Sequence, residues 1–411
     1  MLLSKEVNDK IVLWLLFAFA FSFPFGNIYG TVIIFLLSVL WMLKGNVFSK
    51  IKIAFTTPLF LSYTFLFLIQ FVWLFNTEDF ARAFYLIQCN ASMFVLPLFF
   101  LTFENDLLKV KQKNILLALI LGCIAISILT LSRGLYRYHL NGEIEMLFYS
   151  RLTQHFYHPG FMSIQFAVCI VVLLLDVFEI EKIFPERSIL LKSTILGWFV
   201  VFMIFLSSKI GFVVLMLIII TSCIYGWMKL KNIFGRIIIL CIPVLISVSI
   251  YNSEFGIRIG NAVHAVTTTD NLSANEESTA LRITALNTTT QLINKNWLLG
   301  TGTGDVWGDL RRYYFVDLKS AALKDRLIPH NQYLNSFAKF GFVGIATLLL
   351  LIFFPLQKSW HGKYWAAFFF MILILINCFA EDVFEVQNGV VFTSFFYSYF
   401  FLLCPLKSKV Q

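Results

Sequence analysis

The stretch NILLALILGCIAISILTLS, residues 114–132, contains no charged side chain, whereas Lys109, Lys111 and Lys113 precede it and Arg133 follows it. A helix needs roughly 20 mostly apolar residues to span a membrane. Similar stretches recur between Ile11 and Cys404 with short polar breaks. The sequence therefore predicts an all-α integral membrane protein.

The composition supports this fold class. The chain has 411 residues, of which 59% are hydrophobic, 17% aromatic and only 13% charged. Soluble domains of this length normally carry more charge and fewer aromatic residues. We therefore expect lipid to be the main solvent and do not divide the chain into separate soluble domains.

We predict about twelve spans, with a large extracytoplasmic loop between the ninth and tenth. The tight turn at Ser207-Ser208-Lys209 also allows the seventh and eighth spans to be interpreted as one interrupted re-entrant pair. The twelve predicted spans divide the chain into three parts. These are a membrane bundle of about nine helices over 1–251, a large periplasmic loop over 252–333, and about three membrane helices over 334–411. The spans cover 11–25, 28–43, 58–75, 83–102, 114–132, 160–178, 189–207, 210–228, 236–251, 334–357, 364–380 and 388–405.

The positions of the basic residues predict the orientation, because short cytoplasmic loops are rich in Lys and Arg. Outside the large loop and the helix that follows it, most Lys and Arg fall on one side of the predicted spans. Both termini are therefore expected to be cytoplasmic. The formal net charge of +9 reflects this topology, so we predict no nucleic-acid partner. With the large loop and the helix after it left aside, the extracytoplasmic side holds only the basic residues Arg82, Arg133, Arg137, Arg151 and Lys209.

The first apolar stretch contains Ala18-Phe19-Ala20, which is similar to a signal-peptidase site. Another span follows at once, so we expect a retained first helix. The seven cysteines lie in or beside apolar segments without a Cys-x-x-Cys motif. They predict neither a disulfide framework nor a zinc site. We expect no metal and no cofactor, and the sequence has no Asp-x-Asp pair suited to a metal-bound nucleotide sugar.

Two outside segments are too long to be simple connections. Residues 132–159 collect several Arg, His and Glu side chains, and residues 251–329 are polar, with one amphipathic helix expected at 278–294. Long structured segments between short ones are usually functional. We therefore expect the function to reside in these segments and in the adjoining helix ends.

His330 follows Pro329 at the point where the chain is expected to re-enter the membrane. A histidine can act as a base near neutral pH. A capping or interfacial histidine is the alternative interpretation. Leu299-Gly300-Thr301-Gly302-Thr303-Gly304-Asp305 lies upstream, and it lacks the Gly-Lys-Ser/Thr ending of a nucleotide-binding loop. We predict that this glycine run is a tight turn beside the headgroups.

Taken together, Arg282, the glycine run, His330-Asn331-Gln332-Tyr333-Leu334 and Gly341-x-x-Gly344 resemble the O-antigen ligase and O-antigen polymerase superfamily of bacterial membrane glycosyltransferases. The motifs are confined to about residues 280–345, although the topology is similar over most of the chain. The resemblance implies a metal-independent transferase in the bacterial inner membrane. Its donor would be a glycan on undecaprenyl pyrophosphate, used at the periplasmic face. The acceptor would be lipid A core for a ligase, which we favour, or a growing glycan for a polymerase.

The resemblance also implies catalytic roles for two residues. Arg282 matches the loop arginine of the family, and His330 matches its proposed base. An arginine can bind pyrophosphate through paired hydrogen bonds and stabilise the charge on the leaving group. Lys209 stands where the family has a further arginine. A lysine keeps the positive charge but lacks the planar guanidinium group that can form paired hydrogen bonds. The alternative for Arg282 is a solvated charge on the polar face of a helix. The alternative for Lys209 is an ordinary interfacial lysine.

Other polar residues are expected to face the same compartment. Arg151, His155 and His158 belong to the first long segment, and Glu381 stands with Asp382 and Glu385 after the eleventh span. An ordinary interfacial loop explains the first group somewhat better than a functional role, and a solvated turn explains the second group nearly as well. The predicted set that binds pyrophosphate or acceptor is Lys209, Arg282, Asn331, Tyr333, His158, Arg151 and Glu381.

Two other classes of function remain open. A transporter or flippase predicts ionisable residues inside the spans, but the sequence places almost none there except near span ends. A scaffold subunit of envelope synthesis would leave His330 and Arg282 without individual roles. The exceptions near span ends are Asp176, Lys192, Lys209, Lys339 and Glu381.

Overall fold

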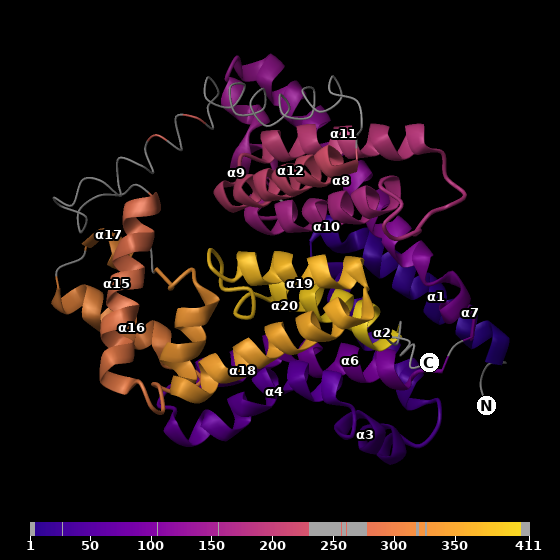
Figure 1. Cartoon of the computed structure of the whole chain (residues 1–411). Helices are drawn as coiled ribbons and strands as arrows, with labels where there is room; N and C mark the ends of the chain where they lie inside the picture. The colour runs from indigo at the N-terminus through magenta and orange to yellow at the C-terminus, as the bar shows by residue number, and fades with distance from the viewer. Residues whose placement is uncertain are drawn as a thin grey trace.

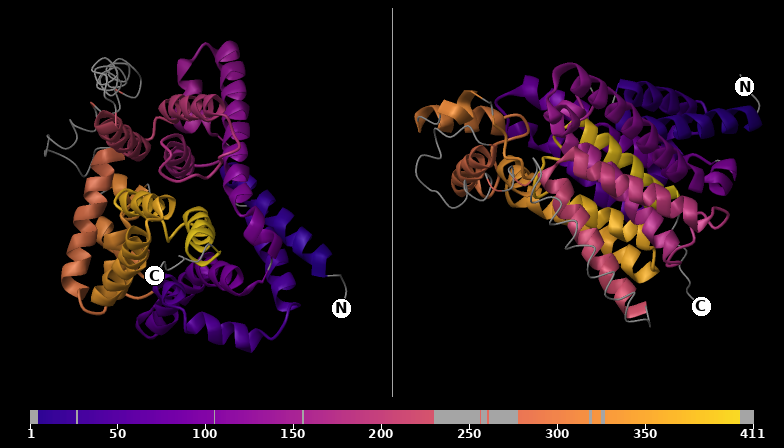
Figure 2. Two further views of the ribbon diagram at one scale, coloured as in Figure 1. Left: turned by 45° about the vertical axis from the view of Figure 1, so that its right-hand side comes forward. Right: turned by 90° about the horizontal axis from the view of Figure 1, so that it is seen from above.

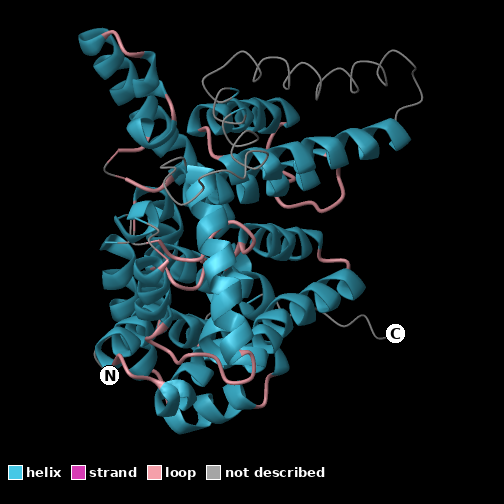
Figure 3. Cartoon of the chain, turned by 90° about the vertical axis from the view of Figure 1, so that its left-hand side faces the viewer, coloured by secondary structure: helices cyan, strands magenta, loops and turns pink. Residues whose placement is uncertain are grey.

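A computed structural model of the chain consists of helices joined by short loops (Figures 1 and 3). It describes residues 5–26, 28–104, 106–154, 156–229, 256, 260, 278–317, 320–324 and 327–403. Within these residues the regular elements are all helices. The predicted all-α fold is confirmed for this part of the chain.

The first half of the chain contributes most of the helices. They are α1 (Lys5–Ser22), η1 (Phe23–Phe25), α2 (Ile28–Met42), α3 (Val47–Phe55), α4 (Pro58–Val72), η2 (Trp73–Asn76), α5 (Phe80–Asn90), α6 (Ser92–Thr102), α7 (Asp106–Lys111), α8 (Lys113–Asn141), η3 (Ile144–Leu147), α9 (Tyr149–Leu152), α10 (Pro159–Val177), α11 (Ile189–Leu206) and α12 (Lys209–Lys229).

The second half supplies a polar group of helices and three apolar ones. They are α15 (Ser278–Asn296), α16 (Val306–Val316), α17 (Ser320–Lys324), α18 (Gln332–Gly362), α19 (Trp365–Asn377), α20 (Gln387–Ser398) and η4 (Tyr399–Leu403). The prediction of a helix at 278–294 is thus confirmed by α15.

Eight helices of the described chain are long and apolar enough to cross a membrane, or nine if α2 and α3, which meet at a bend of 109°, form one span. The chain is therefore a multi-pass membrane protein. The span predicted at 236–251 lies outside the described residues, and α19, with 13 residues, is shorter than the candidate spans. The count of twelve, the place of the large loop, the three-part division and the cytoplasmic termini stay predictions.

The turn between α11 and α12 contains only Ser207 and Ser208. Ser207 closes α11 with a left-handed backbone at φ 45°. Each of the two helices is long and apolar enough to be a span by itself. The structure therefore favours two separate spans over one interrupted pair.

The last three helices lie in the middle of the bundle, between α4 and α6 on one side and α8, α10, α11 and α12 on the other (Figures 1 and 2). α18 packs against α4, and α20 packs against α6. Aromatic side chains also join α4 to α20, where the rings of Tyr63 and Tyr397 stack with their centroids 4.1 Å apart. α15, α16 and α17 gather at one end of the bundle (Figure 1).

Helix α18 is broken near its start. Gly341 has φ 60°, a conformation that costs glycine little and other residues much. The glycine run packs against the break, since Thr301 N donates to Ala338 O (2.9 Å) and Gly302 N donates to Lys339 O (3.0 Å). The opposite side of the run is held by Trp73, whose ring nitrogen donates to Leu299 O at 2.6 Å. The run is thus a tight turn, as predicted, and it joins α15 to α18 and η2.

This contact leads to a prediction for Gly341→Ala. A new Cβ atom would overlap the carbonyl oxygen of Leu298 in a left-handed backbone. The backbone conformation alone should cost about 1–3 kcal/mol. We expect the purified variant to melt at a lower temperature than wild type in detergent. The matched control is Gly308→Ala in α16, where a Cβ atom meets nothing within 4 Å. Equal melting temperatures for the two variants would show that the break does not stabilise the fold.

Candidate active site

His330 lies immediately before α18, where Asn331 caps the helix by accepting a hydrogen bond from Leu334 N at 3.1 Å. The backbone of His330 has φ 47°, which is uncommon for a residue with a side chain. Its N–H donates to Asp382 Oδ2 (2.9 Å), and the N–H of Asn331 donates to Asp382 Oδ1 (3.2 Å). Asp382 therefore holds His330 in this conformation.

The Asp382 carboxylate is buried, and it also accepts a hydrogen bond from the amide of Asn335 at 3.1 Å. Burial and the nearby charge of Glu385 raise the pKa of Asp382 to about 6, against the lowering effect of Asn335 and His330. At neutral pH it is therefore still mainly ionised. An ionised carboxylate accepting these N–H groups is a strong anchor for the start of α18.

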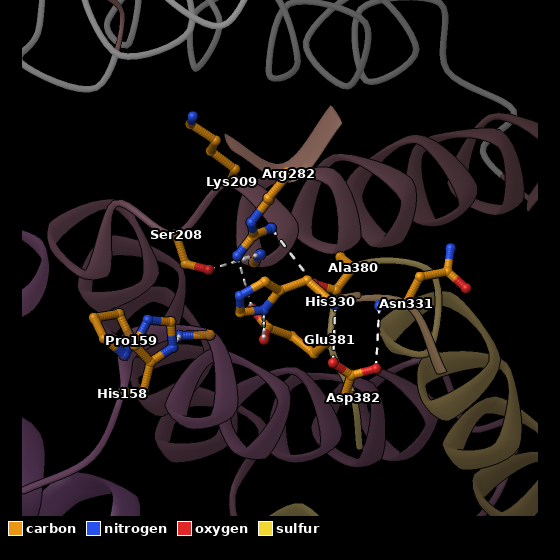
Figure 4. Close-up of polar contacts among 12 residues, drawn as sticks. His158, Pro159, Ser208, Lys209, Arg282, His330, Asn331, Ala380, Glu381 and Asp382 are labelled. Atoms are coloured by element: carbon orange, nitrogen blue, oxygen red, sulfur yellow. Dashed lines mark hydrogen bonds and ion pairs between the residues drawn. The ribbon is translucent and has the colours of Figure 1, made fainter. Parts of the chain in front are cut away.

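The side chains of His330, Glu381 and Arg282 point toward one another (Figure 4). His330 Nδ1 lies 3.7 Å from Glu381 Oε2, and Arg282 Nη2 lies 3.2 Å from Glu381 Oε1. Arg282 also donates to Ala380 O at 3.4 Å. Glu381 is buried, whereas 28% of the His330 side chain and 33% of the Arg282 side chain remain exposed. A partly open histidine and arginine thus share one buried carboxylate.

The charge of Glu381 is set by its neighbours. Burial raises the pKa of Glu381, but His330, Arg282 and His158 lower it by more, so the net pKa is below its usual value. A carboxyl group whose pKa is lowered by folding stabilises the fold at pH values above its ordinary pKa. This contribution is lost as the pH falls through the lowered pKa. Glu381 is therefore an anion at neutral pH, which suits the partner of the Arg282 guanidinium.

Lys209 begins α12, and its ammonium donates to Thr279 Oγ1 at 2.6 Å. Thr279 is one turn before Arg282 on α15. The Lys209 side chain therefore contacts the same end of α15 that carries Arg282. Figure 4 shows the end of the Lys209 side chain directed away from His330, while Ser208 lies beside Arg282. The structure thus brings Lys209 to the edge of the cluster.

His158 caps α10, since its Nδ1 accepts from Gly160 N at 3.3 Å. It also lies close enough to Glu381 to lower the pKa of that carboxyl group. Arg151, in contrast, pairs with Glu143 (2.6 Å) and Glu145 (3.1 Å) of its own segment. The structure places His158 at the cluster and gives Arg151 other partners. His155 lies outside the described residues.

Asn331 and Tyr333 hold α18 against the end of α19. The Asn331 amide donates to Phe379 O at 3.2 Å, in addition to the capping bond. The Tyr333 hydroxyl donates to Leu375 O at 2.9 Å. These contacts position His330, and they do not place either side chain beside the Glu381 carboxylate.

The sequence analysis missed a second pair of charges next to the cluster. Lys339 is buried in α18, and its ammonium lies 2.5 Å from Glu385 Oε1. A signal was present, because Asn331, Asn335 and Lys339 recur every fourth residue and therefore share one face of an otherwise apolar helix. That face meets the acidic residues that follow α19.

Residues 194–349 match a family model described as O-Antigen ligase. This match supports the predicted resemblance to the O-antigen ligase and O-antigen polymerase superfamily. The resemblance is thereby confirmed over these residues. Members of this family are glycosyltransferase-like enzymes that act on lipid-linked glycans in membranes. No curated protein matches the chain.

The region matched to the O-antigen ligase family includes Lys209, Arg282 and His330 but ends before Glu381. The carboxylate that contacts both Arg282 and His330 therefore comes from outside it. In the part of the chain that the structure describes, no group of three or more His, Cys, Asp or Glu side chains is arranged to hold a metal ion. Metal independence stays a prediction.

The buried pair of Lys339 and Glu385 gives a prediction about stability. Removing one partner of a buried ion pair leaves an uncompensated charge and typically costs about 3–5 kcal/mol. We expect Glu385→Ala to lower the melting temperature strongly. The double variant Lys339→Met/Glu385→Ala should regain most of the loss. If the double variant were as unstable as Glu385→Ala, the packing of these residues and not their charges would matter.

Proposed function

We propose that this protein transfers a glycan from undecaprenyl pyrophosphate to a hydroxyl group of lipid A core at the periplasmic face of the bacterial inner membrane. The observation that carries the proposal is the single buried carboxylate of Glu381, which faces both the imidazole of His330 and the guanidinium of Arg282. A general base and an anion-binding group thus lie side by side at the end of the bundle.

His330 is the proposed base. Glu381 faces Nδ1 and favours a proton on that nitrogen, so Nε2 is left to accept a proton from the acceptor hydroxyl. The hydroxyl oxygen then attacks the anomeric carbon of the donor sugar. The bond from that carbon to the phosphate oxygen breaks, and the pyrophosphate leaves with the electron pair. Direct displacement of this kind inverts the anomeric carbon.

Arg282 and Lys209 are the proposed pyrophosphate-binding groups. Both lie near the first turns of long helices, α15 and α12. The amino end of a helix attracts anions through its free N–H groups and its dipole. The guanidinium is one-third exposed and keeps donors in addition to the one that meets Glu381. It is therefore suited to stabilising the charge that develops on the leaving group.

The second candidate function is that of an O-antigen polymerase, which extends the repeat chain with the same donor and a sugar hydroxyl as acceptor. A polysaccharide transporter or flippase has less support. Two buried lysines near helix ends are neutralised in place, since Lys192 lies 2.5 Å from Asp176 and Lys339 lies 2.5 Å from Glu385. Such pairs do not provide the unpaired charges that ion-coupled transport uses.

His330→Asn tests the proposed base. Asparagine adopts a left-handed backbone more readily than most residues, so this variant keeps the φ of His330 and removes the imidazole. General-base catalysis contributes about 10²–10⁴-fold, and we expect the transfer rate of the purified protein to fall by that factor with an unchanged melting temperature. Arg282→Ala should lower the rate comparably, whereas the control Arg312→Ala, on an exposed arginine, should not. Wild-type rates for both His330→Asn and Arg282→Ala would contradict the mechanism.

Complementation distinguishes the two acceptors. We expect the wild-type gene to restore long-chain lipopolysaccharide in a ligase-null strain of the source bacterium, as seen on gels. Restoration of the ladder only in a polymerase-null strain would show that the acceptor is a growing glycan. Restoration in either strain by His330→Asn would favour transport or scaffolding over catalysis.

A further inference from the structure

A cavity of about 320 Å³ opens beside the candidate site, between α5, α16 and the first turns of α18 and α20. Its walls include two aromatic side chains, Tyr85 and Trp307, and three amides, Asn335, Gln387 and Asn388. Arg82, Thr303 and the paired Lys339 and Glu385 complete its polar lining. None of the residues assigned above to pyrophosphate binding belongs to this lining.

Two residues connect the cavity to His330, which does not itself line it. Pro329, which lines the cavity, is the residue immediately before His330. Asn335, which also lines it, donates to the same Asp382 carboxylate that holds the backbone of His330. A ligand in the cavity would therefore contact residues that adjoin or position the proposed base. Arg282 contacts the neighbouring residues Ala380 and Glu381 instead.

The lining has the chemistry that binds a sugar. Aromatic rings offer an apolar surface to the C–H face of a sugar ring, and amides offer both donors and acceptors to its hydroxyl groups. A lipid tail would require an apolar wall throughout, whereas charged and amide groups interrupt the apolar side chains of this one. A second pyrophosphate would favour several free positive charges, but the charge of Lys339 is matched by Glu385 at 2.5 Å, which leaves the lining with the charge of Arg82. The volume is at the lower end of small-molecule sites, and it suits a short part of a glycan.

We propose that this cavity is a glycan subsite, separate from the pyrophosphate site, which holds a sugar residue of the donor or of the acceptor next to His330. This proposal rests on the proposed transferase function and adds the part of the substrate that the protein recognises. Trp307 is the proposed stacking residue, and Asn388 is a proposed partner of sugar hydroxyl groups.

The test uses the full chain in lipid nanodiscs and three probes. They are bare undecaprenyl pyrophosphate, the lipid-linked glycan extracted from the source bacterium, and purified lipid A core. Wild type should bind the glycan-bearing lipid more tightly than the bare lipid. The variants are Trp307→Ala, Trp307→Phe, which keeps an aromatic ring, and Asn388→Ala. Trp297→Ala is the matched control, because Trp297 is exposed and does not line the cavity.

A stacking contact of about 1 kcal/mol corresponds to roughly a fivefold to tenfold change in affinity. For a donor sugar, Trp307→Ala should remove this gain for the glycan-bearing lipid and leave the affinity for the bare lipid unchanged. For an acceptor sugar, the KM for lipid A core should rise by the same factor instead. Trp307→Phe should retain part of the effect, and Trp297→Ala should behave as wild type.

The proposal is overturned if Trp307→Ala and Asn388→Ala leave both the affinity for the glycan-bearing lipid and the KM for lipid A core unchanged. It is also overturned if they weaken the bare lipid and the glycan-bearing lipid equally, since the cavity would then not recognise sugar. Failure of the transferase function has a different signature, which is full activity of His330→Asn. The two failures are therefore distinguishable.

Discussion

The carboxylate of Asp382 accepts hydrogen bonds from the backbone N–H groups of His330 and Asn331, and the rest of the site depends on this contact. A left-handed backbone at a residue such as His330 costs about 1–3 kcal/mol and persists only where the surroundings enforce it. Asp382 supplies that enforcement from the loop after α19. Because the backbone is fixed in this way, the imidazole turns toward Glu381, the residue that precedes Asp382 in the chain.

The fold brings these groups together through the break in α18. Because Gly341 interrupts the helix, carbonyl groups near the break are available to the glycine run, which follows α15. α15 is thereby held against the start of α18, and Arg282 on α15 reaches Glu381. The apolar helices α18, α19 and α20 occupy the middle of the bundle, so the loop between α19 and α20 lies between packed helices (Figure 1). Rigid elements of this kind are what a preorganised site requires.

The parts that the sequence predicted well are those with local signals. An uninterrupted apolar stretch such as 114–132 identifies a helix by itself, and α8 indeed covers Lys113–Asn141. His330 and Arg282 were found from motifs within one part of the chain. The role of Glu381 depends on contacts with Arg282 and His330, which are distant in sequence, and no local pattern fixes such contacts. The pairing of Lys339 with Glu385 was partly foreseeable, because the polar stripe on α18 needs polar partners.

Glu381 and Asp382 are adjacent, yet their environments separate their roles. His330, Arg282 and His158 lower the pKa of Glu381, whereas burial and Glu385 raise that of Asp382. In the proposed mechanism Glu381 holds Arg282 and His330 side by side, and Asp382 connects His330 to Asn335 in the wall of the cavity. Ligases and polymerases share a donor and differ in acceptor. Of the sixteen residues that line the proposed sugar subsite, nine, Trp307 among them, fall within residues 194–349, and the other seven, including Arg82 and Asn388, lie outside them. If the subsite holds the acceptor, the wall that recognises it is therefore built both from the region matched to the family and from helices outside that region.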